Sequence, residues 1–394
     1  MQSSTGSGVR SAAGARLPAV EASSTSELSR LSINDPQVAG LRAAPDFDRV
    51  QDRYSVGLAA SWEVDLFGRL GARVRAARAD ADARRHAVEA ARLAVTTELA
   101  QRYMMLRLLQ QRRAVAARRV EALAALAHLS ALRVARGVSP PVERDSLAAE
   151  ASSARAAVPA LTAEIEEQFA RIDVLAGREV GTARQSLAAI ADIPGSAPID
   201  LASLPAELLR RRPDVLMAEA ELAGRDARVA AAIADRLPRL DLAALFGFLA
   251  GAINPLVGAG ALTAGGSAGL SYNIFDGGRS RAAVDAAKAD MRGAIATYER
   301  TLLDAAADVQ TASAAQVSAH ERVRALQDAE GRLGAVLAAV EQARHQGTSS
   351  LTDVLDVDRR LQDARDARLV AEAEQALALI AIVRALGGYG AKVE

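Results

Sequence analysis

The residue types that most often carry catalytic chemistry are few in this chain and stand far apart. Its four histidines are His86, His128, His320 and His345, on segments expected to be helical, and we expect them to be solvated. Neither a Ser/His/Asp spacing nor a phosphate-binding loop accompanies them. The sequence has no cysteine, which excludes disulfides, thiol catalysis and Cys-type metal sites. The sequence therefore predicts that the protein is not an enzyme and binds no cofactor.

A basic run, Arg210-Arg211-Arg212, is a second place where chemistry could occur, because three guanidinium groups could bind an anion. The competing reading is a turn whose arginines are solvated or paired with carboxylates, and Pro213 suits the first position of a following helix. We favour the turn. The 48 basic and 48 acidic residues balance, so the composition gives no support to a nucleic-acid partner.

Three carboxylates lie near the starts of two predicted helices. Ser350 and Asp353 have the spacing of a capping box, and Asp353 and Asp356 stand three residues apart on one helical face. Glu143 is the counterpart of Asp353 earlier in the chain. Taken alone, such acids in a first turn merely favour the helix dipole.

The elements that must position these residues occur twice in the chain. Residues 68–80 read GRLGARVRAARAD and residues 278–290 read GRSRAAVDAAKAD. The same offset of 210 maps Gly137 onto Gly347 and Ser139 onto Ser349. A chance match would not hold one register over about 110 residues, so the sequence indicates an internal duplication. We expect both glycines to adopt positive φ where long helices reverse direction.

Proline placement predicts where the long helices lie. No proline occurs between Pro45 and Pro140 or after Pro255, and proline inside a helix costs about 3 kcal/mol. The two longest helices, of roughly 100 Å each, are expected in these spans. We predict helices over 70–136, 141–175, 205–235, 278–344 and 350–385, with a loop-like segment at 177–204 and a possible kink at Pro159.

Two other segments have the pattern of β-hairpins. From Tyr54 to Leu66 the even positions are apolar and the odd ones polar or small, which predicts a strand, with residues 19–33 as its partner. Between Leu242 and Phe275 there is no charged residue, a length that invites a transmembrane helix. Seven glycines and Pro255 favour two strands of about ten residues and a glycine-rich loop instead. We expect the apolar faces to contact lipid through Tyr54, Leu58, Trp62, Leu270 and Tyr272.

Four motifs in order carry a resemblance to a known family. They are Trp62-Glu-Val-Asp-Leu-Phe-Gly-Arg69, Leu208-Leu-Arg-Arg-Arg-Pro-Asp-Val215, Tyr272-Asn-Ile-Phe-Asp-Gly-Gly-Arg279 and Gly347-Thr-Ser-Ser-Leu-Thr-Asp-Val-Leu-Asp356. With them the chain, from about residue 9 to 390, resembles the TolC-like outer-membrane efflux proteins. It looks most like the NodT-type lipoprotein branch, which serves tripartite pumps of the RND type.

The resemblance implies a mainly helical fold with a small β part. Duplicated long-helix hairpins would form a trimeric α-helical barrel through the periplasm, and four strands per chain would contribute to a twelve-stranded outer-membrane β-barrel. The corresponding segments are 1–67 (helix end and first β-hairpin), 68–177 (first long hairpin), 178–237 (connecting segment and helix), 238–277 (second β-hairpin) and 278–390 (second long hairpin). Four strands cannot close a barrel alone, which independently favours three copies.

The resemblance also implies the function and the roles of the singled-out residues. The protein would be a homotrimeric, passive exit duct for drugs, metals or other small molecules, partnered by a periplasmic adaptor and an inner-membrane transporter. Gly137, Ser139, Gly347 and Ser349 would form the tips that dock the adaptor. Asp353, Asp356 and Glu143 would narrow the channel as its gate. The alternative, a soluble coiled-coil scaffold or adaptor-like protein, has no reason for uncharged alternating hairpins at the same place in both repeats.

One departure from the family concerns the start of the chain. Members of the family carry a signal peptide, a lipidated N-terminal cysteine and a full pair of helices before the first strand. Here residues 8–16 resemble only the end of the helix that precedes Leu17-Pro18. We therefore expect that about one and a half helices and the export signal are missing from this sequence.

Overall fold

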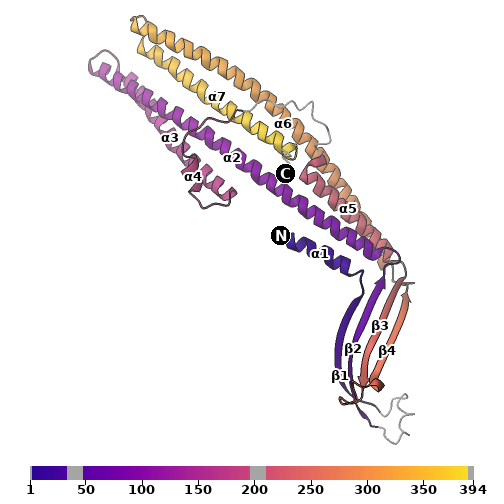
Figure 1. Ribbon diagram of the computed structural model, residues 1–394. Helices are drawn as coiled ribbons and strands as arrows, with labels where there is room; N and C mark the ends of the chain where they lie inside the picture. Colours follow the sequence, from indigo (N-terminus) through magenta and orange to yellow (C-terminus); the bar gives the residue numbers. More distant parts are fainter. Residues whose placement is uncertain (1, 33–47, 196–209, 389–394) are drawn as a thin grey trace. The chain divides into compact units, whose positions relative to one another are not determined.

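A computed structural model describes residues 2–32, 48–195 and 210–388 of the protein. It divides into two compact units, one formed by Met1–Arg85 with Met217–Glu299 and the other by His86–Leu216 with Arg300–Glu394. The first unit holds a four-stranded sheet and the helix ends next to it, and the second holds the helical hairpins (Figure 1). Leu208 and Leu209, the first two residues of the Leu208–Val215 motif, lie outside the described residues.

The helices repeat with the period found in the sequence. Helices α2 (Arg69–Ala135) and α6 (Arg279–His345) each have 67 residues, and α3 (Pro141–Leu175) and α7 (Leu351–Ala385) each have 35. The offset of 210 carries both bounds of α2 onto α6 and both bounds of α3 onto α7. The structure therefore confirms the duplication and the four predicted long helices, with α3 continuing through Pro159.

Three shorter helices complete the helical part: α1 (Gln2–Gly14), α4 (Thr182–Leu187) and α5 (Pro213–Ala234). The loop-like reading of 177–204 was wrong at α4, whose first turn is held by the buried carboxylate of Asp173. The helix expected from 205 begins only at Pro213 among the described residues, because proline there starts a helix better than it continues one.

Side chains of three helices form the core of the second unit. Leu106 and Leu109 of α2 pack with Ile165, Phe169 and Ile172 of α3, and Ala183 of α4 closes the cluster. A second, smaller cluster joins Leu108 of α2 to Leu369 and Ala373 of α7. One helix thus buries two faces, which is why α2 is rich in apolar residues around this point.

The strands are β1 (Ala19–Arg30), β2 (Val50–Val64), β3 (Arg239–Ala250) and β4 (Leu262–Ser271), and a 3-10 turn, η4 (Ala259–Ala261), precedes β4. They form one antiparallel sheet in the order β1-β2-β3-β4, as seen in Figure 1. The two hairpins predicted from the sequence are therefore confirmed, and they pair with each other through β2 and β3.

The second hairpin differs in detail from the prediction. β4 already begins at Leu262, so Gly265 and Gly266 lie within the strand rather than in the loop. Alternation continues past the strand, which ends at Ser271 and leaves Tyr272 one residue beyond it. The adjacent strands β2 and β3 come close where Gly57 faces Gly247, because a Cβ on Gly247 would lie 2.6 Å from the Gly57 Cα.

Candidate functional site

The sheet separates its side chains by the parity of the residue number. Cross-strand partners share a face in an antiparallel ladder, and side chains alternate along each strand. Leu58 pairs with Ala22 and with Phe246, and Phe246 pairs with Ala264. The same register pairs even with even and odd with odd residues throughout the sheet, so each face has one parity.

The even face is apolar. Tyr54, Leu58 and Trp62 of β2 lie on it together with Leu270 of β4. From Tyr54 to Val64 and in the partner stretches of β1, β3 and β4, the even positions carry no charge. Leu58 is 50% exposed and Leu270 is 69% exposed. An apolar face this open in a single chain is a surface for lipid or for a partner.

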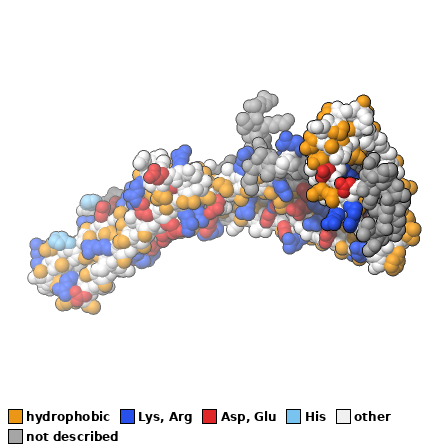
Figure 2. All heavy atoms as spheres, turned by 90° about the horizontal axis from the view of Figure 1, so that it is seen from below, with side chains coloured by type: hydrophobic (Ala, Val, Ile, Leu, Met, Phe, Trp, Pro, Cys, Tyr) orange, Lys and Arg blue, Asp and Glu red, His pale blue; other side chains and the backbone are white. Residues whose placement is uncertain are grey.

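The odd face has the opposite character. It is built mainly from Ser, Thr, Gly and Ala, with charged residues such as Glu21, Arg53 and Asp241. In Figure 2 hydrophobic side chains gather on the sheet, whereas acidic and basic side chains are interspersed along the helices. The sheet thus has the two-faced construction of a barrel wall.

Trp62 also fixes the start of the sheet. Its indole Nε1 donates a hydrogen bond of 2.9 Å to the backbone oxygen of Arg16, just before β1. Trp62 remains 38% exposed. An indole that keeps a hydrogen bond at one end and an apolar body in the open is the arrangement favoured at a membrane interface.

Two motif aspartates hold the junctions between strands and long helices. The Asp65 carboxylate accepts hydrogen bonds from the backbone N–H groups of Leu70 (2.9 Å) and Gly71 (2.7 Å) at the start of α2. Asp276 accepts from Gly278 (2.9 Å) and Ser280 (2.8 Å) at the start of α6. Both carboxylates satisfy first-turn donors that would otherwise be unpaired. In the first and third motifs the aspartate therefore caps the long helix that follows.

In the arginine run, Arg212 is held in an ion-paired turn. Arg212 is buried and donates to Asp214 (2.8 Å), Asp308 (2.9 Å) and the backbone oxygen of Ala385 (3.1 Å). Burial alone would raise the pKa of Asp214, but the Arg212 guanidinium outweighs it and holds that pKa below its usual value. Gly387 has φ +83° and lies so close that a Cβ there would be 3.0 Å from the Arg212 Cα. This confirms the carboxylate-paired reading for Arg212.

The two hairpin ends have the same backbone construction. Gly137 (φ +72°) and Gly347 (φ +75°) are the left-handed residues that end α2 and α6. The N–H of Val138 donates to the oxygen of Arg133, and that of Thr348 to Ala343, both at 2.9 Å. These bonds belong to the Schellman motif, in which the preceding residue adopts the left-handed conformation that glycine adopts most easily. The predicted positive φ is confirmed, and Ser139 and Ser349 follow at half-buried positions.

The predicted acidic residues have different partners at the two ends. The Asp353 carboxylate accepts from the backbone N–H (2.8 Å) and hydroxyl (2.7 Å) of Ser350, which completes the predicted capping box and lowers the pKa of Asp353. At the other end the N-cap is Pro140, without a side-chain hydrogen bond, and Glu143 lies 4.0 Å from Arg133. Glu143 thus matches Asp353 in position but not in bonding.

Asp356 is paired with cations that the sequence analysis did not single out. Arg359 lies 2.8 Å and Arg360 2.9 Å from its carboxylate oxygens. The hydrogen bond from Arg359 is the main reason why the pKa of Asp356 lies below its usual value. Arg359 and Arg360 follow Asp356 by three and four residues, a spacing that predicts ion pairs on one face of a helix.

A groove in the second unit brings two of the predicted acids together. It encloses about 770 Å³ between the end of α2, the start of α3 and the start of α7. Glu143 and Asp356 line it, whereas Asp353 does not. Six of its 15 lining residues are leucines: Leu123, Leu126, Leu129, Leu147, Leu351 and Leu355.

No group of three or more His, Cys, Asp or Glu side chains is placed to hold a metal ion within 2–32, 48–195 and 210–388. In the same ranges no helix combines the length and the apolar character needed to cross a membrane.

Comparison with known proteins places the chain. The family model described as "Outer membrane efflux protein" matches residues 2–178 and 204–388. Outer membrane protein OprJ of Pseudomonas aeruginosa is 29% identical over 382 residues, which are 95% of this chain and 76% of that protein. Nodulation protein T of Rhizobium leguminosarum bv. viciae is 29% identical over 342 residues, 84% of this chain and 68% of that one.

The fold matches as well. The solved structure of the outer-membrane channel OprN superposes with a TM-score of 0.87 at 28% identity, covering 98% of this chain and 85% of that one. The two-faced sheet, the duplicated hairpins and these matches agree with the resemblance drawn from the four motifs. The chain therefore belongs to the outer membrane efflux protein family and is an outer-membrane channel component of an efflux pump.

Proposed function

We propose that three copies of this chain form one passive exit duct through the outer membrane and the periplasm. The observation that carries the proposal is the sheet: four strands with an apolar even face and with β1 and β4 at its edges. Open strand edges leave backbone groups unpaired, which hydrocarbon does not tolerate. Three sheets joined edge to edge give twelve strands, an even number within the range of bacterial barrels.

The parity of the sheet sets its orientation in this proposal. The even face would contact lipid through Leu58 near its middle, with Tyr54 toward one rim and Trp62 and Leu270 toward the other, and Tyr272 just beyond β4. The odd face would line the water-filled lumen, which suits its serines and glycines. Tyrosine and tryptophan are enriched where a barrel meets the headgroups.

The hairpin ends supply the contact with the pump. Gly137, Ser139, Gly347 and Ser349 would dock a periplasmic adaptor protein, which links the duct to an inner-membrane transporter that provides the energy. The exposed fraction of Val138, between the first pair, is 66%, as expected for a surface awaiting a partner. An apolar residue on an otherwise tight turn favours docking over simple solvation.

The closed end of the duct would be formed by Asp353, Asp356 and Glu143. Carboxylates from three chains near one axis repel each other, so cations should be preferred and divalent ions should bind there. The arginines at 359 and 360 offset part of the charge of Asp356. The acidic character of the constriction is therefore weaker than a count of carboxylates suggests.

Two measurements test the proposal. Light scattering of the purified protein in detergent should give the mass of a trimer, and a stable monomer with an intact sheet would contradict it. In planar bilayers, Asp353→Ala with Asp356→Ala should raise the single-channel conductance and weaken block by divalent cations. Asp328→Ala, an exposed acid paired with Arg332 on α6, is the matched control and should leave both properties unchanged. If the double variant and the control have the same conductance and the same divalent block, the two aspartates do not form a gate, and Asp353 only caps its helix.

A further inference from the structure

A hollow on the odd face of the sheet has a composition that the duct itself does not require. It encloses about 540 Å³ and is lined by 12 residues. Eight of them form two adjacent odd rows of the register: Glu21, Ala59, Leu245 and Gly265 in one row, and Ala19, Ser61, Ala243 and Ser267 in the next. The hollow therefore opens on the odd face and crosses all four strands.

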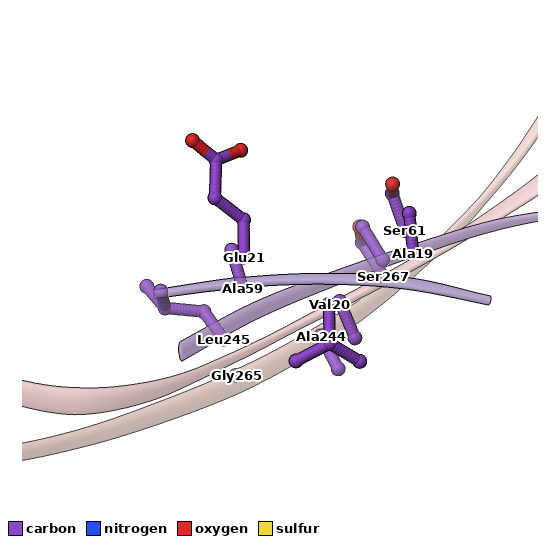
Figure 3. Close-up of a pocket in the computed structure, with 12 residues that line it drawn as sticks. Ala19, Val20, Glu21, Ala59, Ser61, Ala244, Leu245, Gly265 and Ser267 are labelled. Carbon is purple, nitrogen blue, oxygen red and sulfur yellow. The ribbon is translucent and has the colours of Figure 1, made fainter. Parts of the chain in front are cut away.

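The side chains at this hollow separate as the register requires. Figure 3 shows Glu21, Ala59 and Leu245 projecting to one side of the strands, and Val20 and Ala244 to the other. The row neighbour in β4 is Gly265, which leaves space beside Leu245. The hollow is thus produced by small residues that surround one long acidic and one branched apolar side chain.

The charge within the hollow is a single carboxylate. Glu21 is the one charged residue among the lining residues, and it is exposed. Within the described part of the chain no hydrogen bond or ion pair is assigned to its carboxylate. Leu245, in the same row, is 49% exposed. A carboxylate without an assigned partner among the described residues therefore stands beside the apolar side chain of Leu245, on a mostly hydrophilic face.

We infer that this hollow is a transit subsite for amphipathic organic cations. The inference rests on the proposed function, because the odd face must line the lumen for cargo to reach it. Its volume lies in the range of small-molecule sites, roughly 300–1,000 Å³. Glu21 would attract the cationic group, and Leu245 with Ala59 and Ala243 would cover the apolar body of the same molecule.

The same chemistry disfavours other cargo at this place. A calcium ion takes about six to eight oxygen ligands, and one carboxylate with two serine hydroxyls cannot supply them. An organic anion would meet Glu21 without any basic group in the lining. A hydrophilic cation would gain nothing from Leu245. Charge and apolar surface together, rather than either alone, define the ligand.

Two neighbours on the odd face provide matched controls. Glu27 is on the same strand as Glu21, but it lies 3.9 Å from Arg53 and outside the hollow. Leu249 is on the same strand and face as Leu245, is 45% exposed, and does not line the hollow. Each control keeps the residue type, the strand and the parity while it changes the location.

The experiment measures the dissociation constants of tetraphenylphosphonium and tetraphenylborate, which have nearly the same shape and opposite charge, by calorimetry on the full chain in detergent. The wild type should bind the phosphonium more tightly. Glu21→Gln should weaken phosphonium binding about two- to fivefold, which corresponds to the upper part of the range for an exposed ion pair. Leu245→Ser should weaken it by a similar factor, and Glu21→Asp should restore most of the affinity lost in Glu21→Gln. Glu27→Gln and Leu249→Ser should bind as the wild type does.

Three results would overturn the inference: no phosphonium binding by the wild type, equal binding of both ions, or equal loss in Glu21→Gln and Glu27→Gln. Channel conductance in planar bilayers, recorded for the same variants, separates this from the proposed function. If the variants form conducting channels but Glu21→Gln binds the phosphonium as tightly as the wild type, the subsite is refuted and the proposed duct is not. Binding that depends on Glu21 in a protein that forms no channels refutes the duct and leaves the hollow as a ligand site.

Discussion

Replacing Leu58 by arginine is the most direct test of whether the even-numbered residues of the sheet face lipid. Leu58 lies eight residues from Val50 and six from Val64, the ends of β2. At about 3.3 Å per residue and a tilt of roughly 40°, this places it about 15–20 Å from either end of the strand along the membrane normal. It would therefore lie near the middle of the hydrocarbon layer. An arginine there costs about 2–4 kcal/mol, which corresponds to roughly 30- to 900-fold less assembled protein at equilibrium.

The neighbouring residue is the control. Ala59→Arg puts the same charge on the odd face, in the row of Glu21, and should be tolerated. Leu270→Arg lies on the even face but one residue from the end of β4, so its cost should fall to about 0–1 kcal/mol. The assay is the fraction of protein found in outer membranes as the folded, heat-modifiable form. If Ala59→Arg reduces this fraction as much as Leu58→Arg, the even face does not contact lipid.

Three further outcomes are expected, all read from denaturant unfolding followed by helical circular dichroism. Arg212→Ala should lower the free energy of unfolding by about 1–2 kcal/mol. This is less than the loss of a fully buried ion pair would cost, because both partner carboxylates are partly exposed. An unchanged unfolding midpoint would mean that other contacts hold the turn. The pKa of Asp214 is lowered in the folded state, so the stability that its carboxylate contributes is complete above its ordinary pKa, about 3.9, and is lost as the pH falls through the lower folded value. The stability difference between the wild type and Asp214→Asn should therefore shrink below about pH 4. A difference that grows below that pH would mean that the pKa is raised instead. Gly137→Ala should destabilise the protein by about 1–2 kcal/mol, because alanine is strained at the positive φ of this residue. Gly331→Ala, in open space within α6, should stabilise it by about 0.4–1 kcal/mol. A change of the same sign in both variants would show that the positive φ of Gly137 does not matter.

The long elements could be predicted because their signals are local and repeated. The offset of 210 and the proline-free spans were enough to predict α2 and α6 within one residue at each end. Pro141 begins α3, and Ser350 caps α7 as its spacing to Asp353 indicated. Such signals depend on residues a few positions apart, which the sequence displays directly.

The remaining differences depend on contacts between distant segments. Glycines at 265 and 266 favour a loop when considered alone, yet they are in β4 because their partners in β3, Leu245 and Ala244, supply the ladder. The hollow beside Glu21 could not be predicted either, since it requires the register of four strands at once. The pairing of Asp356 with Arg359 depends on a local spacing of three residues, so the sequence does contain the signal for it.

The equal lengths of the two hairpins restrict how this protein can change during evolution. Each inserted residue lengthens a helix by 1.5 Å and turns its far end by about 100°. An insertion in α2 alone would therefore carry Gly137 to a different height and a different side than Gly347 occupies on α6. Seven residues, close to two full turns, would preserve the side but still alter the reach by roughly 10 Å. We therefore expect insertions to be accepted only in pairs, one in each repeat. Both halves of the gene must then encode hairpins of the same length.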